Sequence, residues 1–280
     1  MSNDPAQTFT PDDMNTQSEN HLLASLPPSE FDALAPHLQL VQLRFGQLLS
    51  DAGETVKKVY FPTSAIISMI FLMADGATAE VAAVGNEGVI GVPVLTGGFT
   101  MPTRIEVRSS GYAYAMNAQL FKREFDRHGF IHRLMLYYIQ ALLTQVAQNS
   151  LCNRRHHIVR QVSSWLLLTH DRLKTDELAV TQQLIATMLG VRREGVTEAA
   201  GKLQDAGLIS QRRGKITILD RRGLEGYACE CYGIVRREFQ RLIYDNAAEN
   251  SAGGRTLRAA EIPSNPQGSY LAQRICTIGC

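Results

Sequence analysis

The first half of the chain alternates short apolar runs with glycine-containing turns. Runs rich in β-branched and aromatic residues occupy 39–44, 57–61, 64–73, 78–84, 104–108 and 112–116. The sequences FGQ, DAGE, ADG, GNEG, TGG and SSG separate them, and glycines that recur so often destabilise an uninterrupted helix. Several short strands with turns at near-regular spacing predict an all-β sandwich or barrel. A short helical segment broken by two prolines precedes it at 21–36.

The periodicity becomes helical after Asn117. Apolar residues recur at spacings of three and four over 130–151, which predicts a long amphipathic helix. Its apolar surface is broader than one core-facing stripe requires. Either one stripe packs on the barrel while another meets a partner helix, or a single wide stripe faces the core. Under the first interpretation the partner-facing residues are Met135, Tyr138, Leu142 and Val146.

A helical segment over 154–171 leads to a helix-turn-helix pattern over 179–220. Thr181 is a suitable N-cap for a first helix, and Gly190 accepts the left-handed conformation of the tight turn that ends it. A second helix is expected from about Arg192 to Ala206. Two short strands, LISQ and KITIL, then follow around the basic turn Arg212-Arg213-Gly214, which predicts a winged hairpin.

The chemistry of this segment fits DNA. Recognition helices contact bases mainly through their first turns, and arginine pairs with guanine while glutamate accepts from cytosine. Positively charged wing residues and a helix N-terminus suit phosphates. The expected base-reading residues are Arg192, Arg193, Glu194 and Thr197. The expected phosphate contacts are Thr181, Arg212, Arg213 and Lys215.

Composition and charge support this assignment without proving it. The 280 residues allow two ordinary domains. The net charge is +1, but residues 21–150 carry 9 basic and 10 acidic side chains, whereas residues 151–225 carry 13 and 8. A local basic segment suggests a polyanion site, although a solvated charged surface has the same composition. The polar N-terminus lacks a signal-peptide core and no apolar run is long enough to span a membrane, so a cytoplasmic protein without membrane contact is expected.

The order of these segments resembles the Crp/Fnr family of transcription regulators over residues 21–245. FGQLLSDAGETVKKVYFPTSAI and TQQLIATMLGVRREGVTEAAGKLQDAGLI are the stretches that match, and the second is the more specific. The resemblance implies an α+β protein with a jelly-roll sensor barrel, a dimerisation helix and a winged helix-turn-helix. It places Arg193 and Glu194 at the family's base-reading pair. Glu198 stands where cyclic-AMP-responsive members have a third base-reading arginine.

The sensor departs from the family pattern. Cyclic-nucleotide-binding members have a Gly-Glu-x-Gly loop, whereas this chain reads Gly88-Val89-Ile90-Gly91, and only Arg104 lies close to the expected phosphate-binding pair. Valine accepts no hydroxyl proton, and an unpaired phosphate is costly to bury. We therefore expect no cyclic AMP here, and take Gly88, Val89, Gly91 and Arg104 as the candidate sensor pocket for another signal. No cysteine precedes Cys152, so the N-terminal iron–sulfur cluster of oxygen-sensing members is not expected either.

The remaining cysteines are Cys152, Cys229, Cys231, Cys276 and Cys280. An odd number argues against a disulfide scaffold. Cys229-Glu-Cys231 with Cys152, His156 and His157 is a weak metal or redox signal, and buried cysteines that only pack are common. We assign no metal ligand and no cofactor from the sequence.

The expected organisation is a disordered segment 1–20, a barrel sensor 21–129, a dimerisation helix 130–152, a winged domain 153–245 and a flexible tail 246–280. The expected function is a homodimeric regulator that binds double-stranded DNA at a near-palindromic operator, with RNA polymerase as a candidate partner. A ligand or redox sensor whose winged domain contacts proteins is the alternative. An enzyme is disfavoured because the sequence has no nucleotide-binding glycine loop and no nucleophile elbow. The inducing signal, the operator and the direction of regulation are not encoded in any recognisable motif.

Overall fold

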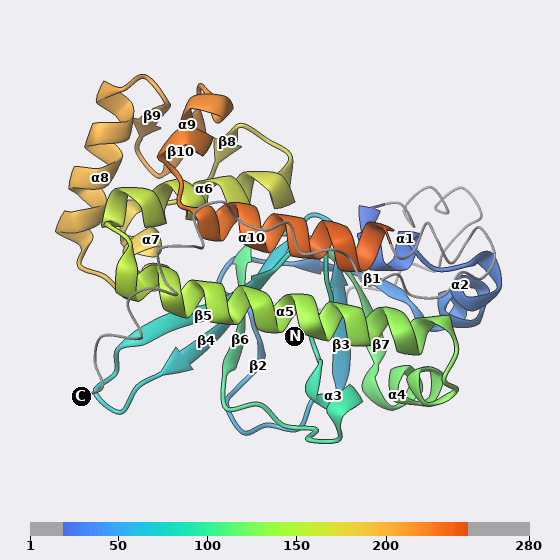
Figure 1. Ribbon diagram of the computed structural model, residues 1–280. Helices are drawn as coiled ribbons and strands as arrows, with labels where there is room; N and C mark the ends of the chain where they lie inside the picture. The colour runs from blue at the N-terminus through green and yellow to red at the C-terminus, as the bar shows by residue number, and fades with distance from the viewer. Residues whose placement is uncertain (1–18, 246–280) are drawn as a thin grey trace, which may run out of the picture.

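The structure is a computed structural model that describes residues 19–245 (Figure 1). The predicted tail 246–280 and residues 1–18 of the predicted disordered segment lie outside the described residues. Asn20 is fully buried, and its side-chain amide donates to the carbonyls of Pro62 at 2.8 Å and Gly88 at 3.0 Å. Its side-chain oxygen caps the first helix by accepting from the Leu23 backbone N–H. The packed part of the chain therefore includes Asn20.

Two short helices and one 3₁₀ turn form the expected proline-broken segment. They are α1 (His21–Ala24), α2 (Pro28–Leu34) and η2 (Ala35–His37). Pro28 occupies the first turn of α2, where its missing N–H has no helical partner to lose. Leu22, Leu23 and Leu34 are buried in the core of the sensor domain.

Two antiparallel sheets form the sensor domain, with strand orders β1-β7-β3 and β2-β6-β4-β5. All six predicted strands are present; β2 is an additional one. The strands are β1 (Gln39–Leu43), β2 (Leu48–Ser50), β3 (Lys58–Pro62), β4 (Ile66–Leu72), β5 (Thr78–Val84), β6 (Arg104–Ser109) and β7 (Gly111–Asn117). Both sheets bury side chains in one core, for example Phe61 from β3 and Val107 from β6. The predicted jelly-roll architecture is confirmed, although the sheets remain open at their edges and do not close into one barrel.

Three helices follow the strands or interrupt them: α3 (Pro93–Thr96), α4 (Ala118–Asp126) and α5 (Phe130–Arg155). The long helix α5 crosses the face of the sensor domain (Figure 1). The carboxylate of Glu30, on α2, accepts from the backbone N–H groups of Phe130 at 2.7 Å and Ile131 at 2.9 Å. This carboxylate satisfies two of the orphan donors at the helix N-terminus and complements its dipole.

The second domain is a winged helix-turn-helix with its own core. Its elements are α6 (Ile158–Leu173), β8 (Glu177–Leu178), α7 (Gln182–Leu189), α8 (Arg193–Asp205), β9 (Ile209–Arg212), β10 (Lys215–Ile218) and α9 (Arg221–Tyr227). The three strands form a sheet in the order β8-β10-β9. Trp165, Leu166, Ile185 and Leu203 belong to this core, and Ile70 of the sensor strand β4 belongs to it as well.

The chain then returns to the sensor domain. Helix α10 (Glu230–Phe239) and a π-helical turn (Gln240–Asp245) run alongside α5 (Figure 1). Val235, Phe239, Leu242 and Ile243 are buried in the sensor core. The last part of the predicted winged domain is thus packed on the first domain. Among residues 19–245, no helix combines the length and the apolar character that crossing a bilayer requires.

Candidate nucleic-acid interface

The helix-turn-helix has the local geometry that the sequence predicts. The Thr181 hydroxyl accepts from the Leu184 backbone N–H at 3.1 Å and caps α7. Gly190 ends α7 in the left-handed conformation, with φ 64° and ψ 35°. The Val191 N–H donates back to the Ala186 carbonyl at 3.0 Å, which closes the turn. These local bonds fix the angle at which α8 leaves α7.

Helix α8 separates a buried face from an exposed face. Val196, Ala199, Ala200 and Leu203 have no exposed surface and pack in the winged-domain core. The opposite face carries Arg192, Arg193, Glu194, Thr197 and Glu198, all of them exposed. The helix lies at the margin of the molecule, on the side away from the sensor sheets (Figure 1). A double helix can therefore reach this face.

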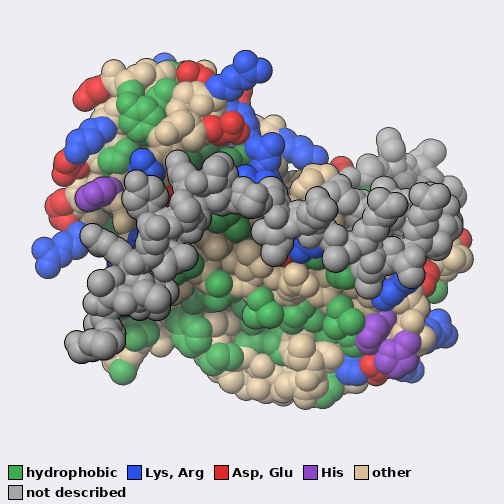
Figure 2. Space-filling view, in the orientation of Figure 1, with side chains coloured by type: hydrophobic (Ala, Val, Ile, Leu, Met, Phe, Trp, Pro, Cys, Tyr) green, Lys and Arg blue, Asp and Glu red, His purple; other side chains and the backbone are tan. Residues whose placement is uncertain are grey.

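The two arginines at the start of α8 have no ion-pair partner among residues 19–245. Arg192 is the N-cap residue and Arg193 is the first residue of the helix. Figure 2 shows basic side chains interleaved with acidic ones over this end of the molecule. An unpaired guanidinium presents all five of its donors to an incoming acceptor. The two side chains are thus available for bases or phosphates.

Thr197 is exposed, but its hydroxyl is engaged within the protein. It lies 2.7 Å from Gln182 Oε1 and 3.0 Å from the Arg193 carbonyl. The Gln182 side-chain amide donates in turn to Gln211 Oε1 at 2.6 Å. This chain of bonds connects α8, α7 and the wing strand β9. The sequence pattern did not single out Gln182 or Gln211. A glutamine in a helix or a strand is ordinary in sequence, and nothing near it indicates its distant partner.

The wing carries the predicted basic residues. Arg212, Arg213 and Lys215 are exposed, and Gly214 turns the hairpin with φ 76°. Lys215 Nζ lies 2.5 Å from Glu177 Oε1 on β8, so part of its charge is balanced within the domain. An exposed pair of this kind contributes little stability, and a phosphate can replace the carboxylate.

Glu198 is held one turn further along α8. Its carboxylate lies 2.7 Å from Lys202 Nζ, and that hydrogen bond and charge lower the pKa of Glu198 below its ordinary value. The side chain is therefore ionised at neutral pH. An ionised carboxylate on this face repels phosphate and accepts only from donor groups such as cytosine N4.

The four predicted sensor residues do not line one cavity. Val89 is buried, and its backbone carbonyl accepts from the Tyr138 hydroxyl at 2.9 Å. Gly88 lies so close to Tyr138 that an added Cβ would sit 2.6 Å from the hydroxyl oxygen. Arg104 pairs with Asp51 at 3.2 Å. Only Gly91 lines a cavity of about 460 Å³, which is bordered by Lys57, Lys58, Tyr60, Glu54 and Met101 among others.

Three of the four predicted partner-facing residues of α5 are not accessible to a partner. Met135, Tyr138 and Leu142 are buried in the chain's own core, because this face packs on the sensor sheets and on α10. Val146 is only partly buried. The exposed apolar residues on α5 are Leu136, Leu143 and Leu151, with 49%, 65% and 52% of their surface exposed. The wide apolar surface thus divides into an inner stripe and an outer one.

A buried charge network connects the sensor loop to the winged domain. Arg172 of α6 donates to Glu87 Oε1 at 2.8 Å and to the Ala83 carbonyl at 2.9 Å. Both charged side chains are largely buried. Gly85 permits this approach, since an added Cβ would meet the Arg172 side chain at 2.7 Å. Glu87 directly precedes the loop that begins at Gly88, so the network links the loop to α6.

The sequence raised three cysteines and two histidines as a weak metal or redox signal. All of them come together in the structure except His157. Cys152, His156, Cys229 and Cys231 meet between the end of α5 and the start of α10. His157 is exposed and does not join them.

These observations define the chain as a jelly-roll domain joined by a long helix to a winged helix-turn-helix. Residues 160–227 match the Crp-like helix-turn-helix domain family. Comparison with curated protein sequences finds no match. The domain match and the fold of the described chain agree with the resemblance to Crp/Fnr regulators that the sequence indicates.

Solved structures that share this fold include FixK2 and a CRP-family transcriptional regulator. FixK2 from Bradyrhizobium japonicum is 17% identical, with a TM-score of 0.60, and the match covers 69% of this chain and 98% of FixK2. A CRP-family transcriptional regulator from Thermus thermophilus is 18% identical, with a TM-score of 0.58 and coverage of 67% and 96%. At these identities the comparison supports the shared fold.

Proposed function

We propose that the protein is a sequence-specific DNA-binding transcription regulator. The observation that carries this proposal is the exposed N-terminal turn of α8, where Arg192 and Arg193 have no ion-pair partner among the described residues. The adjacent wing adds Arg212 and Arg213, also exposed. Helices of this type place their first turn against base edges, while basic wing residues hold phosphates.

The protein acts as a homodimer in this proposal. On α5, Leu136, Ile139, Leu143, Val146, Ser150 and Asn153 follow one another at alternating spacings of three and four, and each is exposed or partly exposed. Figure 2 shows hydrophobic side chains in a band across the face where α5 runs. Leucine at one position of a heptad repeat and a β-branched residue at the other favours two parallel strands. This seam keeps the predicted residue Val146 and leaves out Met135, Tyr138 and Leu142, which are buried.

A dimer places two recognition helices on one face of the duplex. Half-sites about 34 Å apart present successive major grooves, so the expected operator is near-palindromic. The cavity beside Gly91 is the expected place for a signal molecule. Cyclic AMP is not the expected signal, because the side chain of Val89 cannot accept a hydrogen bond from a ribose hydroxyl. A cytoplasmic location and contact with RNA polymerase remain predictions.

Replacement of Arg193 by alanine tests the base-reading role. Loss of one bidentate contact should reduce specific affinity by about 1–3 kcal/mol and relax preference at one base pair. Operator fragments found by genomic selection would be used in a binding titration with the full-length protein. Arg123→Ala, a change to an exposed arginine on the sensor helix α4, should leave binding unchanged. An equal loss for specific and random DNA would contradict base reading by Arg193.

The second candidate function is a ligand or redox sensor whose winged domain contacts a protein. Two internal contacts favour this second function: the Thr197 hydroxyl bonds within the protein, and Glu177 balances part of the Lys215 charge. Both contacts leave fewer free polar groups on this face for DNA. Salt dependence separates the two functions, because each phosphate contact contributes about 0.9 to the slope of log affinity against log salt. A selection without an enriched motif and with a shallow slope would support the protein-contact function.

A further inference from the structure

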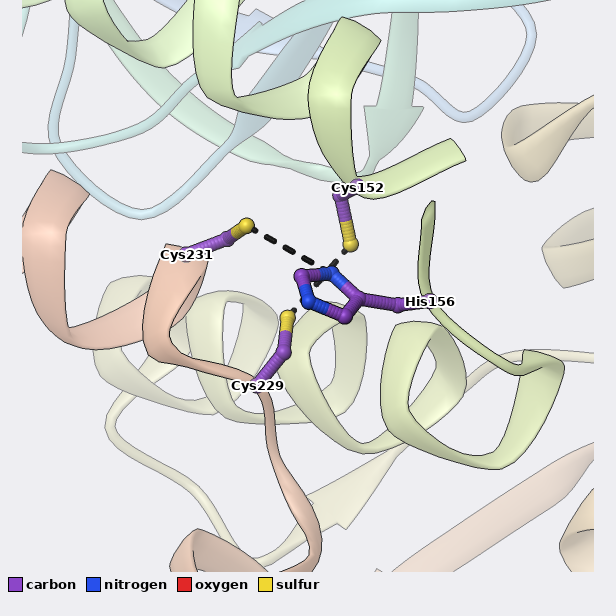
Figure 3. Close-up of side chains that lie close together, drawn as sticks. All are labelled: Cys152, His156, Cys229 and Cys231. Carbon is purple, nitrogen blue, oxygen red and sulfur yellow. Dashed lines mark hydrogen bonds between the residues drawn. The ribbon is translucent and has the colours of Figure 1, made fainter. Parts of the chain in front are cut away.

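Three cysteines and one histidine converge at the junction between the two domains (Figure 3). Cys152 and His156 lie in and just after the last turn of α5, four residues apart. Cys229 is the N-cap of α10 and Cys231 lies in its first turn. The three cysteines form a small buried cluster, and His156 is half-buried beside them. All four side chains point toward a common centre in Figure 3.

The distances are close to those required around a single tetrahedral ion. Cys152 Sγ and Cys229 Sγ are 3.4 Å apart, and Cys231 Sγ is 3.7 Å from His156 Nδ1. All four ligand atoms lie within 4.8 Å of one another. Zinc bonds of about 2.3 Å to sulfur and about 2.0 Å to nitrogen place tetrahedral ligand atoms about 3.6–3.8 Å apart. An iron–sulfur cluster requires its cysteines farther apart, because several iron and sulfide atoms lie between them.

The surroundings orient these ligands. His156 Nδ1 faces the cysteines, while Nε2 lies 3.2 Å from Glu230 Oε1, the arrangement that fixes the tautomer of metal-bound histidines. Cys229 Sγ also lies 3.2 Å from the Ser164 hydroxyl, which accepts from the Cys229 backbone N–H at 3.3 Å. The Gln161 amide donates to the His156 carbonyl at 2.8 Å and holds the chain where α5 ends.

We propose that Cys152, His156, Cys229 and Cys231 form a structural Zn²⁺ site. Four protein ligands leave no open position, which is typical of structural rather than catalytic zinc. The first pair of ligands precedes the winged domain and the second pair follows it. One ion would therefore fasten both ends of the winged domain to the same point and fix its position on the sensor domain. This role is independent of whether the winged domain binds DNA.

The test is the metal content of the full-length protein, purified under reducing conditions without added metal. We expect about one Zn²⁺ per chain, and we expect Cys229→Ser and Cys231→Ser to lose it. His157→Ala is the matched control, because His157 adjoins His156 and does not join the cluster. A Cys276→Ser/Cys280→Ser double variant should also keep the ion. Loss of zinc in either control would contradict the assignment of ligands.

Cobalt provides a measurement that does not depend on the folding of a variant. Wild-type protein stripped of metal and titrated anaerobically with Co²⁺ should develop the intense visible bands of tetrahedral cobalt and a thiolate charge-transfer band, saturating at about one ion per chain. Added Zn²⁺ should abolish both. Glu230→Gln should weaken Zn²⁺ affinity by about 10–100-fold without changing the stoichiometry. Purified protein without zinc that also gives no tetrahedral cobalt spectrum would overturn the proposal, as would stoichiometric iron with sulfide.

Discussion

Arg193 and Arg213 are both exposed, but the backbone is held more firmly at Arg193 than at Arg213. Arg193 begins a helix whose opposite face is packed in the core, so its Cα position is fixed by Val196 and Ala200. Arg213 lies at the tip of the wing beside Gly214. A side chain on a fixed helix can discriminate bases, whereas one on a hairpin tip adapts to the phosphate backbone. The two arginines should therefore affect binding in different ways.

For Arg213→Ala we expect a loss of affinity that is the same for operator and random DNA. The removal of one phosphate contact should reduce the slope of log affinity against log salt by about 1. Fluorescence anisotropy titrations at several salt concentrations measure this slope. Arg127→Ala, which removes an exposed arginine from the sensor domain, is the control. A change in base preference would show that Arg213 reads sequence instead.

At the level of elements, the sequence predicts the helix ends, because residues close in sequence determine them. Thr181 and Gly190 mark the ends of α7 because a hydroxyl cap and a left-handed glycine act within a few residues. The inner and outer stripes of α5 could not be separated, since both are apolar at helical spacing and only the packing of β5 and α10 on the helix distinguishes them.

Contacts between distant residues account for most of what the sequence did not predict. Glu30 caps α5 from 100 residues away, and Glu87 pairs with Arg172 across 85 residues. No periodicity encodes such a pair, because each residue type is ordinary at its own position. The candidate sensor pocket was placed too broadly for the same reason. The loop sequence does not show that Tyr138 occupies the space beside Gly88, and only Gly91 of the four candidate residues lines the cavity.

The outer stripe of α5 leads to a prediction about assembly. Leu143→Arg should weaken the homodimer at least about 10-fold, because burial of a leucine contributes about 1.5–3 kcal/mol and each partner loses one. Sedimentation analysis over a range of concentrations measures this shift. Phe45→Arg alters a residue of similar exposure, 60% against 65%, in the turn between β1 and β2, and should leave assembly unchanged. Unaltered association of the Leu143 variant would contradict the proposed seam.

At the scale of the whole molecule, the ion pair between Arg172 and Glu87 connects the two domains. Arg172→Met should lower the free energy of unfolding by about 3–5 kcal/mol, because Glu87 would be left charged and largely buried without its partner. The double variant with Glu87→Gln should recover part of this loss, with an interaction energy of about 0.5–3 kcal/mol.

Urea unfolding of the four proteins of this double-mutant cycle provides the measurement. Arg127→Met is the matched control, because it breaks an exposed pair with Glu124 and should change stability by at most about 1 kcal/mol. Strictly additive effects of the Arg172 and Glu87 variants would show that the two side chains are not coupled. In that case the sensor loop would not communicate with α6 through this pair.

Strand β4 of the sensor domain also contributes Ile70 to the winged-domain core. The winged domain therefore lacks part of its core when it is separated from the sensor domain. A graft of residues 158–228 onto a foreign sensor would leave a void where Ile70 packs, unless the recipient hairpin supplied an apolar side chain at the same place. Chimaeric regulators built from this chain would have to carry the β4–β5 hairpin together with the helices it supports.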